Sequence, residues 1–304
     1  MNRTGFIINP IAGTGKYRSI EKHIRQVFPT ADIYITSQTG EAQVIAAKLV
    51  KQQYDCIVAV GGDGTVNEVA CPLVGSSTAL GILPTGSGNG LARHLHIPLE
   101  PAAALHHLIS SKPRSIDVGI IAANASARNT TKDEPQNGKM FFCTAGVGFD
   151  AQVSVRFEKQ RKRGFLSYLR CIIKEYVHYK SQKYTITTEK KSIETTAFLI
   201  TFANASQWGN NAYIAPQANI EDGYMDAVII PRVSFPRLLI MAVRLLRKKI
   251  HHDPLVTTLR FNSLTLSRQY PAPVHIDGEP VTDDTIATER ITVNVLKSAL
   301  QVIR

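Results

Sequence analysis

Short apolar runs alternate with amphipathic stretches along the first third of the chain. The apolar runs, such as GFIINP at 5–10 and CIVAV at 56–60, have the length and composition of buried strands. The stretches between them carry apolar residues at helical spacing. The predicted strands are 5–10, 32–36, 56–60 and 80–84, and the predicted helices are 18–28, 41–53, 66–74, 90–95 and 102–109. This repeated alternation predicts an α/β domain with a doubly wound parallel sheet and helices on both faces.

The pattern changes after RSIDVGII at 114–121. Most segments from there to 289 have the composition of strands, which predicts a mostly antiparallel, sandwich-like second domain. The polar, turn-rich stretch 122–139 predicts a flexible loop between two of them. We therefore expect an α/β domain over 1–115 and a β-rich domain over 116–289. The apolar run 291–296 fits a last strand in either domain, so 290–304 is a candidate to return to the first.

Two longer segments of the second half have helical periodicity, at about 155–180 and 235–252. In the second of them, basic residues lie mostly off the apolar stripe that contains Leu238, Leu245 and Ile250. Two interpretations remain open: a core-packing helix with a solvated basic face, or a helix that works at a membrane surface.

Composition limits the class of protein. At 304 residues the chain can hold two cores, and 44% hydrophobic with 19% charged residues is ordinary for a globular protein. The four cysteines form no CxxC pair, which argues against a zinc site or a disulfide framework. No apolar run has signal-peptide or membrane-spanning length. We expect a cytoplasmic protein.

The net charge of +11 is concentrated in the second half of the chain. Eleven lysines and arginines fall between Arg156 and Lys191 against three glutamates, and residues 227–252 contain no acidic residue. Nucleic acid, an anionic membrane and a polyanionic substrate are the partners that such charge attracts, beside a plain role in solubility.

Three glycine-rich turns follow three of the predicted strands of the first domain. They are NPIAGTGK at 9–16, GGDGTVNE at 61–68 and PTGSGNGLAR at 84–93. In a doubly wound sheet all three lie at the carboxyl edge, where glycine-rich backbone before a helix N-terminus can bind phosphate. The P-loop pattern fails because Pro10 and Tyr17 stand where glycine and Ser/Thr are needed, and GxGxxG fails at Leu91. A phosphate site of another kind is expected.

The three turns, together with the late motif HIDGEP, resemble the diacylglycerol kinase catalytic-domain family, which includes bacterial diacylglycerol kinases and sphingosine and ceramide kinases. The resemblance runs from about residue 4 to 303. GGDGT alone is shared with NAD kinases and phosphofructokinases, but the four motifs in this order mark the lipid kinases. The resemblance implies an N-terminal α/β domain, a C-terminal β-sandwich, an active site between them, and ATP with Mg²⁺.

The resemblance also implies roles for individual residues. Asp63 is expected to organise Mg²⁺ and the phosphates, and Glu279 of the DGE motif to act as general base. Asn89 is expected to shape the third turn. The residues implied in nucleotide binding are Asn9, Pro10, Ile11, Ala12, Gly13, Thr39, Gly62, Asp63, Gly64, Thr65, Val66, Asn67, Glu68 and Ser87. Those implied as ligands of a structural Mg²⁺ are Asn219, Asp222 and Tyr224.

These residue types suit phosphoryl transfer, which needs charge neutralisation and alignment, and a carboxylate near the acceptor hydroxyl. Asp277 is expected to tolerate substitution better than Glu279. The third turn reads GSGN instead of the commoner GTGN, and sphingosine-kinase-like members also use GSGN. The expected acceptor is diacylglycerol, then a sphingoid base or ceramide, reached by peripheral binding to an anionic membrane and not to nucleic acid. A kinase of a soluble nucleotide such as NAD, a non-catalytic regulator and a homodimeric state remain open.

Overall fold

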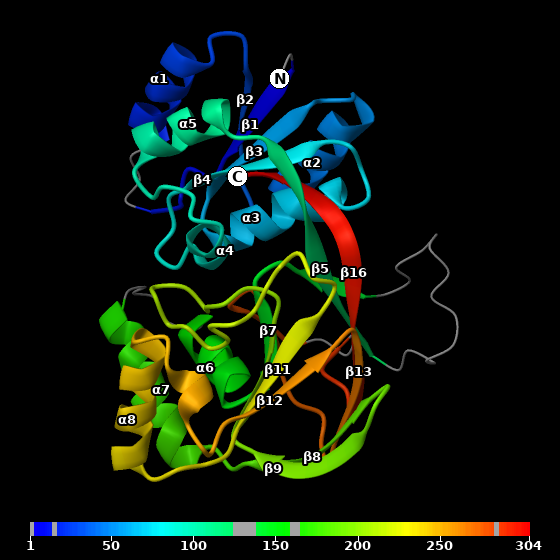
Figure 1. The fold of residues 1–304 in the computed structure, drawn as a ribbon. Helices are drawn as coiled ribbons and strands as arrows, with labels where there is room; N and C mark the ends of the chain where they lie inside the picture. The colour runs from blue at the N-terminus through cyan, green and yellow to red at the C-terminus, as the bar shows by residue number, and fades with distance from the viewer. Residues whose placement is uncertain (1–2, 14–16, 124–137, 159–164, 283–285) are drawn as a thin grey trace. The chain divides into compact units, whose positions relative to one another are not determined.

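The computed structural model describes residues 3–13, 17–123, 138–158, 165–282 and 286–304, with the backbone alone for 165–169 (Figure 1). The end of the first glycine turn at 14–16, most of the predicted loop 122–139, and Lys159, Arg161, Lys162 and Arg163 lie outside the described residues. The chain divides into two compact units. Unit 1 is Met1–Asp117 with Lys297–Arg304, and unit 2 is Val118–Leu296.

Unit 1 has the predicted parallel sheet. Its strands run in the order β2-β1-β3-β4, and the end of β16 (Arg290–Ile303) adds to β4 in parallel, with Val302 opposite Leu80. The strands are β1 (Thr4–Ile8), β2 (Asp32–Ile35), β3 (Cys56–Gly61) and β4 (Ala79–Pro84). The helices are α1 (Tyr17–Val27), α2 (Glu41–Lys51), α3 (Asp63–Ala70), α4 (Gly90–His94) and α5 (Pro101–Ser110), with a 3₁₀ turn at Cys71–Leu73.

The core of unit 1 explains why its central strands are apolar along their whole length. Residues of α1 and α5 pack with Phe6, Val58 and Leu83 on one face of the sheet. On the other face, α2 packs so closely on β1 that a Cβ at Gly5 would lie 3.0 Å from the side chain of Leu49. Strands covered on both faces need apolar residues at every position. The doubly wound α/β prediction is confirmed.

Unit 2 contains two sheets with antiparallel neighbours, as predicted. One is ordered β12-β11-β10-β7-β14-β15, and the other contains β16-β13-β8-β9 with β5 and β6. A core that includes Val147, Ile186 and Phe202 draws on strands of both sheets. The strands not yet given are β5 (Pro113–Ala123), β6 (Lys139–Phe141), β7 (Thr144–Gly148), β8 (Gln182–Thr188), β9 (Ser192–Ala197), β10 (Leu199–Ala203), β11 (Met225–Ile230), β12 (Thr257–Phe261), β13 (Ser263–Arg268), β14 (Val274–Ile276) and β15 (Glu279–Val281).

Three helices of unit 2 pack in a second core, which includes Phe198 and Val228 of the six-stranded sheet region. They are α6 (Phe149–Glu158), α7 (Phe165–His178) and α8 (Phe235–Leu246). The single helix expected near 155–180 is therefore two. The one expected over 235–252 ends at Leu246, because Lys248 adopts a positive φ of 58° before a 3₁₀ turn at Ile250–His252. Among the described residues, no helix is long and apolar enough to cross a membrane.

Candidate active site

The three glycine turns of unit 1 meet at one edge of the parallel sheet. Each follows a strand, and the strands are neighbours, so their carboxyl ends bring the turns together. The Asn9 N–H donates to the Val60 carbonyl at 3.0 Å, and the Thr85 N–H donates to the Gly61 carbonyl at 2.9 Å. The arrangement expected from the order of strands and turns is present.

The backbones of the turns approach one another so closely that only glycine fits. A Cβ on Gly86 would lie 2.5 Å from the Gly62 Cα, and one on Gly13 would lie 2.3 Å from the Thr85 carbonyl oxygen. A Cβ on Gly88 would lie 2.7 Å from the Asp63 carboxylate. These contacts join the first turn to the third and the second to the third. The glycines therefore fix the turns against one another, besides allowing a ligand to approach.

Side chains join the same turns. The Asn9 amide donates to the Thr65 hydroxyl at 3.0 Å. The Asp63 carboxylate accepts from the Gly90 N–H at 2.7 Å, which connects the start of α3 to the start of α4. Glu68 of α3 accepts from the Gly40 N–H at 2.9 Å, beside the predicted nucleotide residue Thr39. Asn9 and Thr65 thus hold the first and second turns together, and Glu68 ties α3 to the segment that carries Thr39.

Asn89 closes the third turn, as expected. It adopts the left-handed conformation, with φ 51°. Its amide oxygen accepts from the Gly86 N–H at 3.1 Å, and its amide nitrogen donates to the Gly86 carbonyl at 2.7 Å. Arg93 of α4 donates to the Gly88 carbonyl at 3.0 Å, a contact that the sequence reasoning missed. The only sequence signal for it was its place on the helix that follows the turn.

The edge is open to a ligand. Gly13, Thr39 and Ser87 are exposed, and Ile11 has 82% of its surface exposed. The helix α3 begins directly after Gly62, and no side chain caps it. Its first-turn N–H groups carry the positive end of the helix dipole, which favours an anion. Interlocked glycine backbone and a helix N-terminus together make an edge that suits an anion such as phosphate.

The residues at this edge suit a nucleotide-bound Mg²⁺. That ion usually takes one or two carboxylates together with phosphate oxygens and waters. Asp63 supplies one carboxylate at this edge. Within the described ranges, no cluster of three or more His, Cys, Asp or Glu side chains could form a metal cage from protein alone. The donor set therefore fits an ion shared with a phosphate ligand.

The second predicted metal site, at 219–224 in unit 2, is a tight turn. The Asn219 side chain accepts from the Glu221 N–H at 3.1 Å, and Asp222 accepts from the Tyr224 N–H at 3.0 Å. The second carboxylate oxygen of Asp222 is paired with Arg260. In this arrangement the positive charge beside Asp222 is the Arg260 guanidinium. The assignment of Asn219, Asp222 and Tyr224 as Mg²⁺ ligands stays a prediction.

Glu279 lies at the start of β15 and is exposed. It follows a two-residue hairpin turn, in which Asp277 and Gly278 have φ values of 48° and 88°. Asp-Gly is a favoured pair for such a turn, because both positions need positive φ. A short hairpin of this kind fixes the backbone position from which the Glu279 side chain extends.

Asp277 holds this hairpin to the rest of unit 2. Its carboxylate accepts from three successive backbone N–H groups, those of Phe142 at 3.0 Å, Cys143 at 2.8 Å and Thr144 at 3.0 Å. The expectation of a mild effect on substitution took account of the local turn alone. The structure corrects its basis, because this side chain anchors the strand pair that carries Glu279.

A buried pair joins α6 to β14, the strand that precedes Asp277. His275 of β14 contacts the Asp150 carboxylate of α6 through Nε2 at 3.0 Å, and Thr201 donates to the same carboxylate oxygen at 3.2 Å. A Cβ on Gly146 would lie 2.5 Å from the His275 ring, so the ring fills the space over β7. Neither His275 nor Asp150 was predicted. Their separation of 125 positions in the chain hides the pair from any local pattern.

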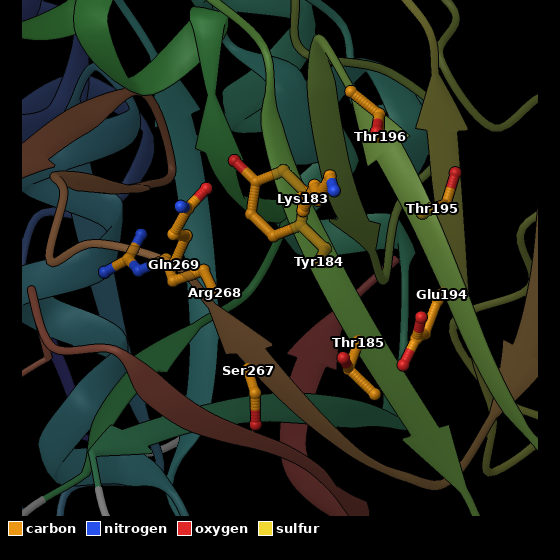
Figure 2. Close-up of a pocket in the computed structure, with 9 residues that line it drawn as sticks. All are labelled: Lys183, Tyr184, Thr185, Glu194, Thr195, Thr196, Ser267, Arg268 and Gln269. Atoms are coloured by element: carbon orange, nitrogen blue, oxygen red, sulfur yellow. The ribbon is translucent and has the colours of Figure 1, made fainter.

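A shallow pocket of about 520 Å³ opens in unit 2, on strands β8, β9 and β13 (Figure 2). It contains none of the predicted site residues. Its lining combines exposed Lys183 and Glu194 with buried Tyr184 and Arg268, so it has mixed charge. We assign it no part in the chemistry.

Comparisons with known proteins bear on both units. A family model for the diacylglycerol kinase catalytic domain matches residues 3–121, and a model for the YegS C-terminal NAD kinase beta sandwich-like domain matches residues 143–304. The chain is 30% identical to a "Probable lipid kinase YegS-like" of Pseudomonas aeruginosa, over 72% of this chain and 69% of that protein. It is 26% identical to a "Diacylglycerol kinase" of Bacillus subtilis, over 92% of this chain and 90% of that protein.

The fold has solved counterparts. A crystal structure described as a diacylglycerol kinase from Bacillus anthracis superposes with a TM-score of 0.72 at 18% identity, covering 99% of this chain and 96% of that one. That likeness shows a shared fold across both units. Taken with the two family models and the order of the four motifs, it shows that the chain belongs to the lipid kinase family that contains the diacylglycerol kinases and the YegS-like proteins.

Proposed function

We propose that this protein is an ATP-dependent lipid kinase that transfers the γ-phosphate of ATP to a lipid hydroxyl, with diacylglycerol as the first acceptor and phosphatidic acid as the product. The observation that carries the proposal is the set of three interlocked glycine turns at one edge of the unit 1 sheet. Membership in the lipid kinase family supports it.

The nucleotide role falls to unit 1. The backbone N–H groups around Gly62, Gly64 and Ser87 would bind the phosphates, and the first turn at 9–13 would cover them. Asp63 would orient the phosphates through a shared Mg²⁺. When bound, that ion neutralises charge on the transferring phosphoryl group. The hydrogen bond from Gly90 holds the Asp63 carboxylate in one orientation for this task.

The acceptor role falls to unit 2. A lipid hydroxyl is a poor nucleophile, and a carboxylate within reach of its proton contributes about 10²–10⁴-fold to the rate of such reactions. In our proposal Glu279 accepts the proton as the oxygen attacks the γ-phosphorus, and ADP leaves as the bond between the γ-phosphorus and the β-phosphate oxygen breaks. Support comes from its exposure and from the Asp277 anchor, which restricts the hairpin that carries it.

Two other acceptors stay open. A sphingoid base or ceramide stays open because sphingosine-kinase-like members share the GSGN form of the third turn. A soluble nucleotide such as NAD stays open because NAD kinases share the GGDGT motif. The relatives named as lipid kinases favour a lipid, and the name of the Bacillus subtilis relative favours diacylglycerol. We further propose that the enzyme works in the cytoplasm and visits the membrane surface to reach its acceptor.

The test is a transfer assay with γ-labelled ATP, Mg²⁺ and single acceptors. The panel is diacylglycerol, monoacylglycerol, sphingosine, ceramide and NAD, each with and without ATP competitor. We expect label in the lipid extract with diacylglycerol above all others. Label in NAD with none in any lipid would overturn the proposal, and so would binding of ATP without transfer to any acceptor.

A further inference from the structure

The outward face of α8 in unit 2 is apolar. Five of its twelve residues are large apolar side chains with 46–60% of their surfaces exposed: Phe235, Leu239, Ile240, Val243 and Leu246. They occupy one continuous side of the helix at helical spacing. Soluble monomers seldom expose contiguous apolar side chains in this number without a binding role.

The other sides of α8 are already committed. Met241 is buried and Leu245 half-buried in the core beneath the helix. Arg237 and Arg244 both pair with Asp253, at 2.6 and 2.8 Å, and the Asp253 side chain is fully buried. These two arginines are therefore held in ion pairs with a buried carboxylate and do not belong to a solvated basic face. They fix the helix with its apolar side turned outward.

Helix α7 extends the same surface, and Figure 1 shows it beside α8. The ring of Tyr176 on α7 lies 5.9 Å from that of Phe235, and its hydroxyl donates to the Val233 carbonyl at 2.5 Å. Ile173 and Val177, one turn apart on α7, are 48% and 68% exposed. We call these two residues and the five exposed apolar residues of α8 the α7–α8 face.

Cations border the α7–α8 face. Arg247, Lys248 and Lys249 are exposed just after α8, and Arg170 and Lys174 are exposed on α7. The acidic residue of α7, Glu175, is paired with Arg156 at 2.7 Å. Residues 227–252 contain no acidic residue. An apolar surface with a basic border is the chemistry that an anionic lipid surface complements.

We propose that the α7–α8 face docks onto an anionic lipid bilayer and inserts its apolar side chains among the acyl chains. This deepens the proposed function, on which it rests for its purpose, by naming the surface that brings the enzyme to its lipid. A second copy of the chain is a poorer occupant, because a symmetric contact through this face would bring two basic borders together.

The test is cosedimentation of the full chain with vesicles of phosphatidylcholine, alone or mixed with phosphatidylglycerol. The double variant Leu239→Gln, Leu246→Gln should bind the mixed vesicles at least about tenfold more weakly than the parent. The matched control is Val44→Gln with Ile109→Gln, which are 70% and 57% exposed on helices of unit 1 and should bind like the parent. The double variant Arg247→Gln, Lys249→Gln should bind the mixed vesicles more weakly than the parent, and its remaining binding should respond less to added salt.

A second measurement reports insertion directly. Leu246→Trp, in a chain with Trp208→Phe, should shift its fluorescence to shorter wavelength when mixed vesicles are added and should be quenched by brominated lipid chains. No shift, or vesicle binding of the Leu239/Leu246 variant equal to that of the parent, would overturn docking through this face. Conversion of a dimer to a monomer by that variant, with vesicle binding unchanged, would assign the face to a second copy instead.

Failure of this proposal is distinguishable from failure of the kinase proposal. The Leu239/Leu246 variant should phosphorylate a short-chain diacylglycerol below its micellar concentration as fast as the parent does. Loss of vesicle binding with that rate preserved supports docking. Binding without any kinase activity in the parent chain would contradict the proposed function alone.

Discussion

Asp277 anchors the hairpin of Glu279 through three amides, and removing its charge should destabilise unit 2. Its Oδ1 accepts from Cys143 and Thr144, and its Oδ2 accepts from Phe142. In Asp277→Asn one carbonyl oxygen can still accept two of the amides, but an NH₂ group would face the third donor. Asparagine also tolerates positive φ, so the turn itself should persist.

The magnitude follows from these contacts. A hydrogen bond to a charged group contributes about 1.5–3 kcal/mol net, and neighbouring bonds do not add fully. We expect Asp277→Asn to lower the free energy of unfolding by about 2 kcal/mol. Asp277→Ala should lower it by about 4 kcal/mol, because all three amides lose their acceptor and alanine disfavours the left-handed turn.

Trp208 is the chain's single tryptophan, and it packs in a core of unit 2. Its fluorescence during urea unfolding therefore reports on this unit, and the midpoint shift with constant slope gives the change in stability. The control is Glu100→Gln in unit 1, where the carboxylate accepts from two exposed amides and the Trp208 transition should not move. Asp277→Asn within about 0.5 kcal/mol of the parent, the size of an ordinary surface change, would refute the anchor.

Three further predictions concern single carboxylates. Glu279→Gln should lower turnover about 10²–10⁴-fold with ATP affinity nearly unchanged in steady-state kinetics; equal losses of both would make it a structural residue. Asp63→Asn can still accept from Gly90 but loses its charge, so less than about a tenth of the parent turnover should remain. A larger remaining turnover would contradict the role of Asp63. Burial works to raise the pKa of Asp253, but the Leu255 amide and two arginines hold it below the ordinary 3.8. The stability that ionised Asp253 contributes is thus present above pH 3.8 and lost as the pH falls through the lower folded pKa. The melting temperatures of the parent and of Asp253→Asn should therefore converge as the pH is lowered. A constant difference between the two melting temperatures would show that the pairing is unimportant.

The sequence predicted most of unit 1 because its information is local there. Period and length separate strands from helices, and parallel alternation forces the three glycine turns to one edge. The individual contacts between the turns were beyond it, since the approach of Gly86 to Gly62 depends on the three-dimensional course of both.

Unit 2 was predicted in outline only, because its decisive contacts join distant positions. Asp277 meets amides more than 130 positions earlier in the chain, and no spacing rule connects them. Periodicity placed Arg237 and Arg244 on a polar side of α8 but could not supply Asp253 as their partner. One of the two interpretations left open therefore assigned these arginines to a solvated basic face, whereas the structure pairs them with a buried carboxylate.

The central claim is that the interlocked glycine turns hold the phosphates of ATP, and an ATP titration of Gly86→Ala tests it most directly. The added methyl would lie 2.5 Å from the Gly62 Cα, so the backbones of both turns must separate. The matched variant Gly62→Ala places its methyl 3.2 Å from the Gly86 Cα and demands a smaller shift. Calorimetry with Mg²⁺ and ATP should show Gly86→Ala weaker than the parent by at least about tenfold, or about 1.4 kcal/mol, and Gly62→Ala affected less. Parental affinity in a folded Gly86→Ala protein would contradict the account.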